Sequence, residues 1–324
     1  MKVPYKELIQ KAIKAPSGHN TQPWKFKTDE DSITIYPDYN RSLPIVDADN
    51  HALFISLGCA LENLVIAAQH FGFKTNITYY TEQAGSESIV VQLTPSSAEK
   101  ENGVLFNSID IRQATRNKYN REPIPEKDIE KLRAISKQED VQAILITTEK
   151  DTQQILELIK EGNMLQFSNP SFIAELIKWI RFNKKAAIKQ GDGLFGEVTG
   201  NPSVPAWFGK LVMKLSYSPK KEASKCVELI NSSSALMIFI AERNDKKAWI
   251  NVGRSFERTV LMAASLNINH AHANMPCEEL EVRQKFIDLF GLKNGEQPLL
   301  LIRLGYSEKM PYSFRRPLND IMLE

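Results

Sequence analysis

The stretch Gly58-Cys59-Ala60-Leu61-Glu62-Asn63-Leu64-Val65 decides the fold, because a second stretch of the chain repeats its pattern. The second stretch is Gly253-Arg254-Ser255-Phe256-Glu257-Arg258-Thr259-Val260, which keeps the glycine, the glutamate and the valine. Each lies in a long predicted helix, over residues 50–71 and 248–266, with small residues where two backbones can pack closely. Three identities also arise by chance, but with the order of elements around them they predict a duplicated α+β unit.

The other predicted elements support this duplication. Before the linker, the pattern predicts a helix over 4–14 and strands over 24–28, 33–36, 75–80 and 88–93. After it, the pattern predicts helices over 125–137, 150–166 and 278–290, and strands over 141–147, 235–241 and 298–304. We therefore expect an α+β fold of two fused units that form a single-chain pseudo-dimer. The halves span 1–98 and 104–324, and a polar linker over 96–103 joins them.

Composition and charge narrow the class of protein. The chain is 42% hydrophobic and 25% charged, which is typical of a globular protein. Its net charge of +2 predicts no nucleic-acid and no membrane partner. Three widely spaced cysteines indicate a reducing compartment without a disulfide framework or zinc module. No apolar signal segment stands at the N-terminus and no uncharged apolar run approaches the roughly 20 residues of a membrane span, so we expect a cytoplasmic protein.

The loop between the first helix and the first strand is rich in chemistry. Residues 15–24 read Ala15-Pro16-Ser17-Gly18-His19-Asn20-Thr21-Gln22-Pro23-Trp24. The two prolines fix φ and restrict the residues before them, so the loop is stiff. A stiff loop crowded with neutral donors and acceptors suits a flat heterocycle with carbonyls and ring nitrogens, and a flavin is such a molecule.

Two pairs of arginines are candidates for binding a phosphate. Arg112 and Arg116 stand four residues apart near a helix start, where one turn could clamp a phosphate with charge-assisted bonds. A solvated basic face explains the same spacing equally well. Arg315 and Arg316 can likewise be interpreted as a phosphate-binding pair or as a solvated basic face. Because a phosphate needs several donors, the two pairs from distant segments could bind one phosphate together.

These motifs resemble those of the nitroreductase superfamily of FMN proteins. The pattern Ala-Pro-Ser-x-x-Asn-x-Gln-Pro-Trp at 15–24 is similar to that family's loop at the flavin ring. Arg112-x-Ala114-x-Arg116 resembles its Arg-x-Ser-x-Arg phosphate motif, with Ala114 in place of the serine, and Arg315-Arg316-Pro317 resembles its basic C-terminal contact. Residues 248–258, 274–276 and 312–317 look like the Acg-like branch, whose members contain two fused units. The resemblance covers nearly the whole chain.

The resemblance implies a nitroreductase-like fold with FMN as cofactor, and it assigns roles to residues. The phosphate would be held by Arg112, Arg116, Arg315 and Arg316. The ribityl chain and ring would lie against Pro16, Ser17, Gly18, His19, Asn20 and Gln22. Asn274 and Met275 would lie near the reactive ring edge, although Asn274 reads equally well as a turn residue. No side chain is needed as a catalytic nucleophile or base, because the chemistry belongs to the cofactor.

Three functions follow from the resemblance. The first is an FMN-dependent, NAD(P)H-linked oxidoreductase that reduces a small-molecule acceptor, nitroaromatic or quinone-like. The second is a flavin-sequestering protein with little turnover. In that case a lid-like insertion at about 168–222, predicted to be irregular and to expose Trp179, Phe195, Trp207 and Phe208, would cover the ring. Trp179, Trp207 and Phe208 are the candidates for this cover, although such residues more often serve packing. The third is a structural protein without flavin, for which Ala114 is the support.

The distribution of motifs predicts one FMN per chain. Only Met1 to Pro4 precede the first helix, where no arginine motif fits. In the second half, the helix over 125–137 passes directly into the strand over 141–147 without a Pro-Ser-x-x-Asn loop. The loop of the first half and the arginines of the second can form one FMN site. The second site that pseudo-symmetry would create lacks both the loop and the arginine motif. The protein would be a monomer as pseudo-dimer, or a homodimer of such chains.

Two further motifs have plain explanations. Residues 191–196 match G-x-G-x-x-G by letter, but no strand and no βαβ context precede them, so we expect a loop. His270-x-His272 lacks an accompanying Cys or carboxylate cluster at suitable spacing, so we expect no metal site.

Overall fold

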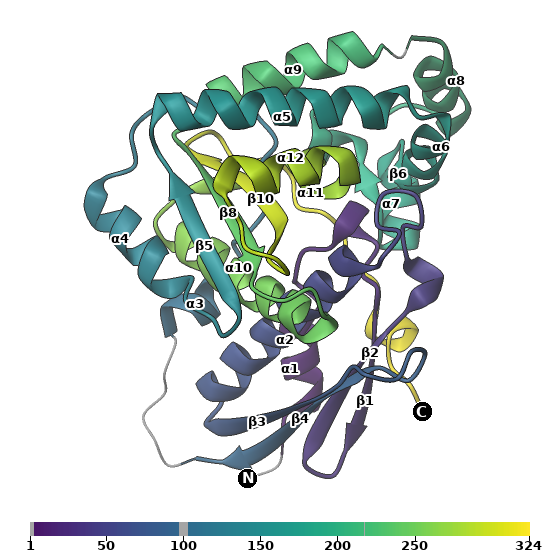
Figure 1. Ribbon diagram of the computed structural model, residues 1–324. Coiled ribbons are helices and arrows are strands. Elements are labelled where there is room, and N and C mark those ends of the chain that lie inside the picture. Colours follow the sequence, from purple (N-terminus) through teal and green to yellow (C-terminus); the bar gives the residue numbers. More distant parts are fainter. Residues whose placement is uncertain (1–2, 97–102, 217) are drawn as a thin grey trace.

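The computed structural model describes residues 3–96, 103–216 and 218–324. Residues 97–102, which make up most of the predicted linker, lie outside the described residues. In Figure 1 one sheet lies at the bottom and a second lies above it, with the long helices α2 (His51–His70) and α10 (Lys246–Ser265) between them. The bounds of α2 and α10 agree closely with the helices predicted over 50–71 and 248–266, which carry the repeated stretch.

The first unit is a small α+β layer. Around α2 it contains α1 (Tyr5–Ala12), β1 (Trp24–Asp29), β2 (Ser32–Pro37), β3 (Phe73–Tyr80) and β4 (Ser88–Pro95). Short 3-10 turns lie at Gly18–Asn20 and Tyr39–Arg41. The strands are antiparallel in the order β1-β2-β4-β3. One face of each strand packs on α2, as the alternation of buried and exposed residues requires.

The second unit repeats this topology. It contains α3 (Gly103–Ser108), α4 (Glu126–Ile135), β5 (Val141–Ile146), β8 (Ala235–Ala241), β9 (Asn269–His272), α11 (Met275–Glu278), α12 (Leu280–Phe290) and β10 (Gln297–Gly305). Its sheet has the order β5-β8-β10-β9. When β5, β8, β9 and β10 are taken as counterparts of β1, β2, β3 and β4, the two orders are the same. The expected fold of two fused α+β units is therefore confirmed.

The two units differ most between their first and second strands. In the first unit, Glu30 and Asp31 alone separate β1 from β2. In the second unit the connection from β5 to β8 contains α5 (Glu149–Ser168), α6 (Pro170–Trp179), β6 (Ile180–Arg181), α7 (Lys184–Gln190), β7 (Leu194–Phe195), a 3-10 turn over Gly196–Thr199, α8 (Ala206–Ser216) and α9 (Pro219–Asn231). The insertion thus starts earlier than residue 168. It lies along the top and right of the molecule in Figure 1.

The expectation of an irregular segment over 168–222 was wrong. Three helices, α6, α7 and α8, lie there. Asn169 and Asn183 cap α6 and α7 through their side-chain oxygens, and Pro170 stands in the first turn of α6. The expectation of exposed aromatics holds for Trp207 and Phe208, but Trp179 and Phe195 are buried.

The crossing of α2 and α10 joins the two units. A Cβ atom on Gly58 would lie 2.0 Å from the carbonyl oxygen of Ile250, and one on Gly253 would lie 2.0 Å from that of Ile55. The two helices therefore approach backbone to backbone at the two repeated glycines. Across this crossing one apolar core takes side chains from both sheets and both helices.

Helix α2 is long and apolar enough to span a membrane by length and composition, and among the described residues it alone meets this test. It is 94% buried over that window, with neighbours on all sides. These are the properties of the central helix of a packed core.

The end of the described chain returns to the first unit. Phe26 in β1 exchanges two backbone hydrogen bonds with this tail, as donor to Ile321 at 2.8 Å and as acceptor from Leu323 at 2.7 Å. Figure 1 shows this segment beside β1 at the lower right. On its way there, the tail over 312–317 passes the loop over 15–24, which places the two predicted basic segments and the loop in one region.

Candidate functional site

The loop over 15–24 has a strained backbone. His19, Asn20 and Gln22 all have positive φ, at 48°, 55° and 54°. Asparagine tolerates this region, but histidine and glutamine adopt it at a cost. Gly18 and Ser17 hold the turn, since Thr21 N donates to Gly18 O at 2.9 Å and Gln22 N donates to the Ser17 hydroxyl at 2.9 Å. Strain of this kind is concentrated at functional sites and is maintained by the surrounding structure.

Asn20 and Gln22 fasten this loop to the insertion. Asn20 Nδ2 donates to Gly193 O at 3.0 Å, and Gln22 Nε2 donates to Gly191 O at 2.8 Å. Residues 191–193 are held from the other side by Arg181, which donates two hydrogen bonds to Asp192. The expected loop is present only over 191–193, because Leu194 and Phe195 form the short strand β7, and this loop packs against the segment that carries Asn20.

The same two side chains hold the tail. Asn20 Nδ2 also donates to Phe314 O at 3.2 Å, and Gln22 Oε1 accepts from Arg316 N at 2.9 Å. The Arg316 guanidinium donates to Gln22 O at 3.1 Å and to Asp320 O at 2.8 Å. Its donors are thus engaged by the chain itself, and a phosphate at Arg316 would have to compete with these contacts.

Arg315 and Arg112 converge on the C-terminal end of α1. Arg315 donates to Ile13 O at 2.8 Å, to Lys14 O at 2.9 Å and to Asn20 Oδ1 at 3.2 Å. Arg112 donates to Lys14 O at 2.6 Å. Guanidinium groups are favourable here because the last carbonyls of a helix carry partial negative charge. Asn20 and Arg112 are therefore brought into one region, joined through Arg315 and Lys14.

Arg116 lies close to two histidines, His19 in the first half of the chain and His272 in the second. Desolvation, and next the charge of Arg116, lower the pKa of His19 to about 4. Desolvation, followed by the charges of Arg116 and Arg112, lowers the pKa of His272 to about 4. His272 is nevertheless exposed to solvent. His272 is thus reached by solvent although much of the protein surrounds it, and we call the space beside His272, His19 and Arg116 the recess. At neutral pH both imidazoles are uncharged.

Strand β9 forms one side of the recess. Thr115 N donates to His270 O at 2.8 Å, so the segment with Arg116 runs beside β9. The ring of Phe256 on α10 lies 5.3 Å from that of His272, measured between centroids. Arg116 donates to Val198 O at 3.3 Å and has no carboxylate within 4 Å among the residues that the structure describes.

Positive charge is in surplus around this recess. Desolvation, and then the charge of Arg112, lower the pKa of Arg315 to about 9. Desolvation also lowers the pKa of Arg116 and of Arg303. The carboxyl group of Glu257, which lies 3.3 Å from Arg112 Nε, has its pKa raised to about 7 by burial. It is therefore only about half ionised at neutral pH, so the region favours an anionic ligand.

Asn274 and Met275 lie at the start of α11. Asn274 Oδ1 accepts from Leu301 N at 2.9 Å and its Nδ2 donates to Glu278 at 3.1 Å. Met275 packs against Gly162 on α5. The Asn274 side chain thus ties α11 to β10, which agrees with the turn interpretation left open above. Its place near a flavin ring stays a prediction.

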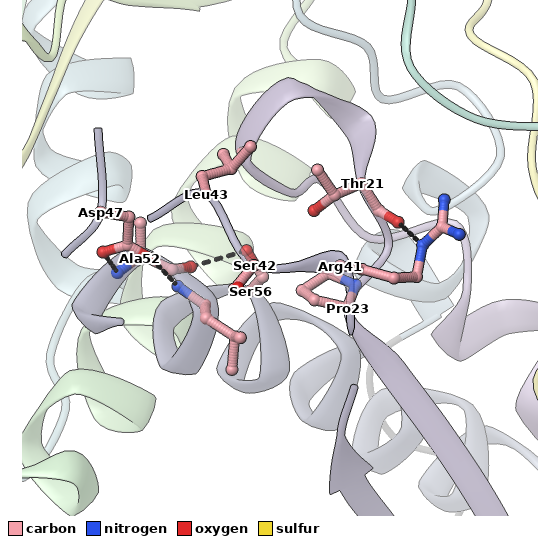
Figure 2. A pocket seen from close by; sticks show the side chains of 10 residues that line it. Thr21, Pro23, Arg41, Ser42, Leu43, Asp47, Ala52 and Ser56 are labelled. Atoms are coloured by element: carbon pink, nitrogen blue, oxygen red, sulfur yellow. Dashed lines mark hydrogen bonds between the residues drawn. The ribbon is translucent and has the colours of Figure 1, made fainter. Parts of the chain in front are cut away.

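A separate small pocket, partly open to solvent, lies behind the loop (Figure 2). It is lined by Gly18, Thr21, Pro23, Arg41, Ser42, Leu43, Asp47, Ala52, Leu53 and Ser56, and none of these belongs to the arginine cluster. Asp47 at its edge accepts from Ala52 N and Leu53 N, both at 2.9 Å, and so caps α2.

Asp47, Asp49 and His51 offer one possible metal-ligand atom each within 4.8 Å. The carboxylates already serve the helix start and the histidine, so the arrangement is that of a helix cap.

Motif reasoning missed several residues of the site. His272, Phe256 and Glu257 face the recess or its arginines, and none of them was assigned to the site, although each stands in a stretch that the sequence analysis singled out for another reason. The signal for Glu257 was present, because it is the repeated glutamate of the second long helix and a glutamate is seldom fully buried without a partner. His272 was considered only as part of a His-x-His metal motif, and β9, with four residues, was too short to be predicted as a strand.

Comparisons with known proteins give full-length relatives. No family model matches the chain. "Putative NAD(P)H nitroreductase Rv3131" from Mycobacterium tuberculosis is 22% identical over 325 residues, covering 97% of this chain and 90% of that protein. "Putative NAD(P)H nitroreductase acg" from the same species is 19% identical over 324 residues, covering 98% and 94%.

Among solved structures, a nitroreductase with bound FMN from Desulfitobacterium hafniense matches 69% of this chain and 98% of its own, at 10% identity and a TM-score of 0.42. The chain is therefore similar, over nearly its whole length, to two mycobacterial proteins that are each named as putative NAD(P)H nitroreductases.

Proposed function

We propose that the protein is an FMN-dependent, NAD(P)H-linked oxidoreductase that reduces nitroaromatic or quinone-like acceptors. The observation that carries this proposal is the surplus of positive charge around a recess that both halves of the chain line. Arg112, Arg116 and Arg315 stand there against the partly protonated carboxyl group of Glu257. These arginines have more N–H donors and positive charge than the nearby side chains can match. An FMN phosphate is an anion whose oxygens accept hydrogen bonds, so it would supply the missing partner.

Unpartnered polar atoms also fit such a group. Among the described residues, Gln113 Nε2, His270 Nε2 and Arg303 Nη1 are buried without a hydrogen-bond partner, and Arg112 Nε has only its ion pair with Glu257. Buried donors of this kind cost free energy unless a ligand or water satisfies them. Arg116 and Arg112 are the residues that would hold the phosphate, because Arg315 and Arg316 already donate to several backbone carbonyls.

The loop over 16–20 and the neutral imidazoles would line the space for the ring. At neutral pH His19 and His272 each offer one N–H donor and one nitrogen acceptor, which suits the mixed edge of a flavin. Bound FMN would supply the hydride and electron transfer itself, while the chain binds, orients and excludes water. Asn20 and Gln22 keep the loop in its strained form by holding residues 191–193.

Arg116→Ala tests the phosphate assignment. The variant should lose about 1.5–3 kcal/mol of FMN affinity, or about 10- to 150-fold, because one charge-assisted contact disappears. Riboflavin, which lacks the phosphate, should bind both proteins equally, so the readout is the ratio of the two affinities by fluorescence titration. Lys118→Ala is the control, since Lys118 is an exposed cation of the same segment paired with Glu228. An unchanged ratio in Arg116→Ala would refute the assignment.

A sequestering function is the second candidate, because the insertion lies on the site. Val198 O accepts from Arg116, and residues 191–193 bond to the loop. Trp207 and Phe208, proposed from sequence as the cover, point instead to solvent. Anaerobic addition of NADH or NADPH separates the two candidates. The enzyme should lose its absorbance near 450 nm within seconds, whereas colour that persists with both donors would favour sequestration.

A further inference from the structure

Helix α8 presents an apolar stripe to solvent. Trp207 is 71% exposed, and Phe208, Leu211 and Val212 are between 40% and 45% exposed. Their spacing of one and four residues places them on one side of the helix. On the other side, Gly209 packs on the ring of Phe182, where a Cβ atom would lie 2.1 Å away. The helix is therefore fixed to the body by its glycine face and turned outward by its aromatic face.

The segment around α8 is strongly basic. Residues 178–225 contain ten Lys and Arg against three Asp and Glu, a net charge of +7, whereas the whole chain carries +2. The rest of the chain is thus acidic by five charges. Among the described residues, several exposed lysines of this segment have no ion-pair partner, namely Lys184, Lys185, Lys189, Lys210, Lys220 and Lys221.

These lysines flank the stripe. Helix α7 begins directly after Phe182, on which α8 packs, and Phe182 O also accepts from Val204 N at 2.9 Å, just before α8. Helix α9, with Lys220 and Lys221 in its first turn, starts after α8. Figure 1 shows α6, α7 and α8 at one corner of the molecule, with one end of α9 leading to it.

We propose that α8 and the lysines around it dock the protein on the surface of an anionic lipid bilayer. A short helix with Trp, Phe and Leu on one face and lysines beside it is the chemistry that places apolar side chains at the headgroup boundary. A lipid surface receives such an exposed stripe without a matching pocket. The proposed surface is the cytoplasmic leaflet, which carries anionic headgroups.

A second copy of the chain fits this surface less well. A two-fold contact through α8 would bring the same lysines face to face, and the three carboxylates of the segment are too few to offset the repulsion of its ten cations. The net charge of the whole chain suggested no membrane partner. That value is the sum of a basic segment over 178–225 and an acidic rest of the chain, so the net charge does not reveal the basic surface around α8.

Binding to vesicles tests the proposal with the full chain. The protein should sediment with vesicles that contain about one third phosphatidylglycerol and should stay in solution with phosphatidylcholine alone. Its tryptophan emission should shift to the blue on binding. Trp207 is the source of this shift, because Trp24, Trp179 and Trp249 are each at most 8% exposed already. Absence of sedimentation with the anionic vesicles would overturn the proposal.

Paired variants identify the residues responsible. Trp207→Ser with Phe208→Ser should weaken vesicle binding by about tenfold or more, since apolar insertion is lost. Leu280→Ser with Leu289→Ser on α12 is the matched control, because these residues are 71% and 38% exposed. Lys184→Glu with Lys185→Glu should also weaken binding. Lys127→Glu with Lys137→Glu, at exposed positions near α4, should not.

Two outcomes would assign the surface to a different partner. If the lysine pair abolished binding and the aromatic pair had no effect, the contact would be purely electrostatic, as for an acidic protein, and insertion would be refuted. If the free protein formed a dimer in sedimentation velocity that the aromatic pair dissociated, α8 would be an interface between copies. Circular dichroism of each variant establishes that it is folded before the vesicle data are compared.

Discussion

At the scale of single residues, Glu257 is the buried group whose charge state is most open to change. Its side chain is fully buried on α10 beside Arg112. Burial raises its pKa from 4.5 to about 7, and the charge of Arg112 opposes part of that rise. The folded protein therefore keeps this proton at a pH where the unfolded chain has lost it. The stabilisation is complete below pH 4.5 and is lost as the pH rises through about 7.

Glu257→Gln should remove this pH dependence. Between about pH 5 and about pH 8, the wild type should lose about 2–3 kcal/mol of unfolding free energy relative to the variant, because glutamine does not titrate. Urea unfolding of both proteins across this range measures the difference. Glu228→Gln serves as control, since the pKa of that exposed carboxyl group is lowered by Lys118 and it stays ionised throughout. A constant difference between wild type and Glu257→Gln would contradict the assigned burial effect.

The residues of the site were partly predictable from sequence. The loop over 15–24 and the two arginine pairs stand in local motifs, and the structure does bring them together. Their partners were not predictable, because the acceptors of Arg315 are the backbone carbonyls of Ile13 and Lys14, which have no sequence signature. His272 enters the recess only because β9 lies beside the segment of Arg116, a relation set by the tertiary fold.

At the scale of elements, the crossing of α2 and α10 is the contact most sensitive to substitution. Gly58→Ala and Gly253→Ala should each destabilise the protein by about 3 kcal/mol or more, because the added methyl group meets a backbone carbonyl that cannot move without shifting a helix. Thermal and urea unfolding measure the effect. Gly103→Ala is the control, as nothing lies within 4 Å of its added Cβ, and it should be neutral or slightly stabilising.

The duplicated glutamates of these two helices have taken different partners. Glu62 on α2 accepts from Arg254 at 2.7 Å and from Arg258 at 2.8 Å, both on α10, and so joins the two units. Glu257 is its counterpart on α10, and it faces Arg112 beside the recess. The same position of the repeat thus joins the two units in one helix and contributes to the charge balance of the candidate site in the other.

The long elements were predictable because their apolar periodicity is regular, as in α2 and α10. The helices of the insertion were not, because Pro, Gly and Asn clusters read as loop signals. Asn169-Pro170 and Asn183 are in fact helix starts, which the capping preference of asparagine and the first-turn preference of proline explain. Strand β9 was missed because four residues are too few for an alternation to be recognised.

At the scale of the whole molecule, the two units offer room for one composite site. In the first unit, residues 13–23 separate α1 from β1 and include the strained loop. In the second unit, residues 136–140 alone connect α4 to β5, which is too short for an equivalent loop. We therefore predict that a chain saturated with FMN binds one molecule. Native mass spectrometry should show a single added FMN mass per chain, and a second one would contradict the prediction.

The helix crossing at Gly58 and Gly253 also has a genetic consequence. In a dimer of separate subunits, a defective surface can be rescued by a sound partner that is made in the same cell. Here the two faces belong to one polypeptide and meet by intramolecular collision, so dilution does not part them and halves are not shuffled between molecules. A mutation that damages one unit is therefore present in every chain that carries the other unit. Co-expression of two chains, each mutated in a different unit, should not restore the activity that each has lost.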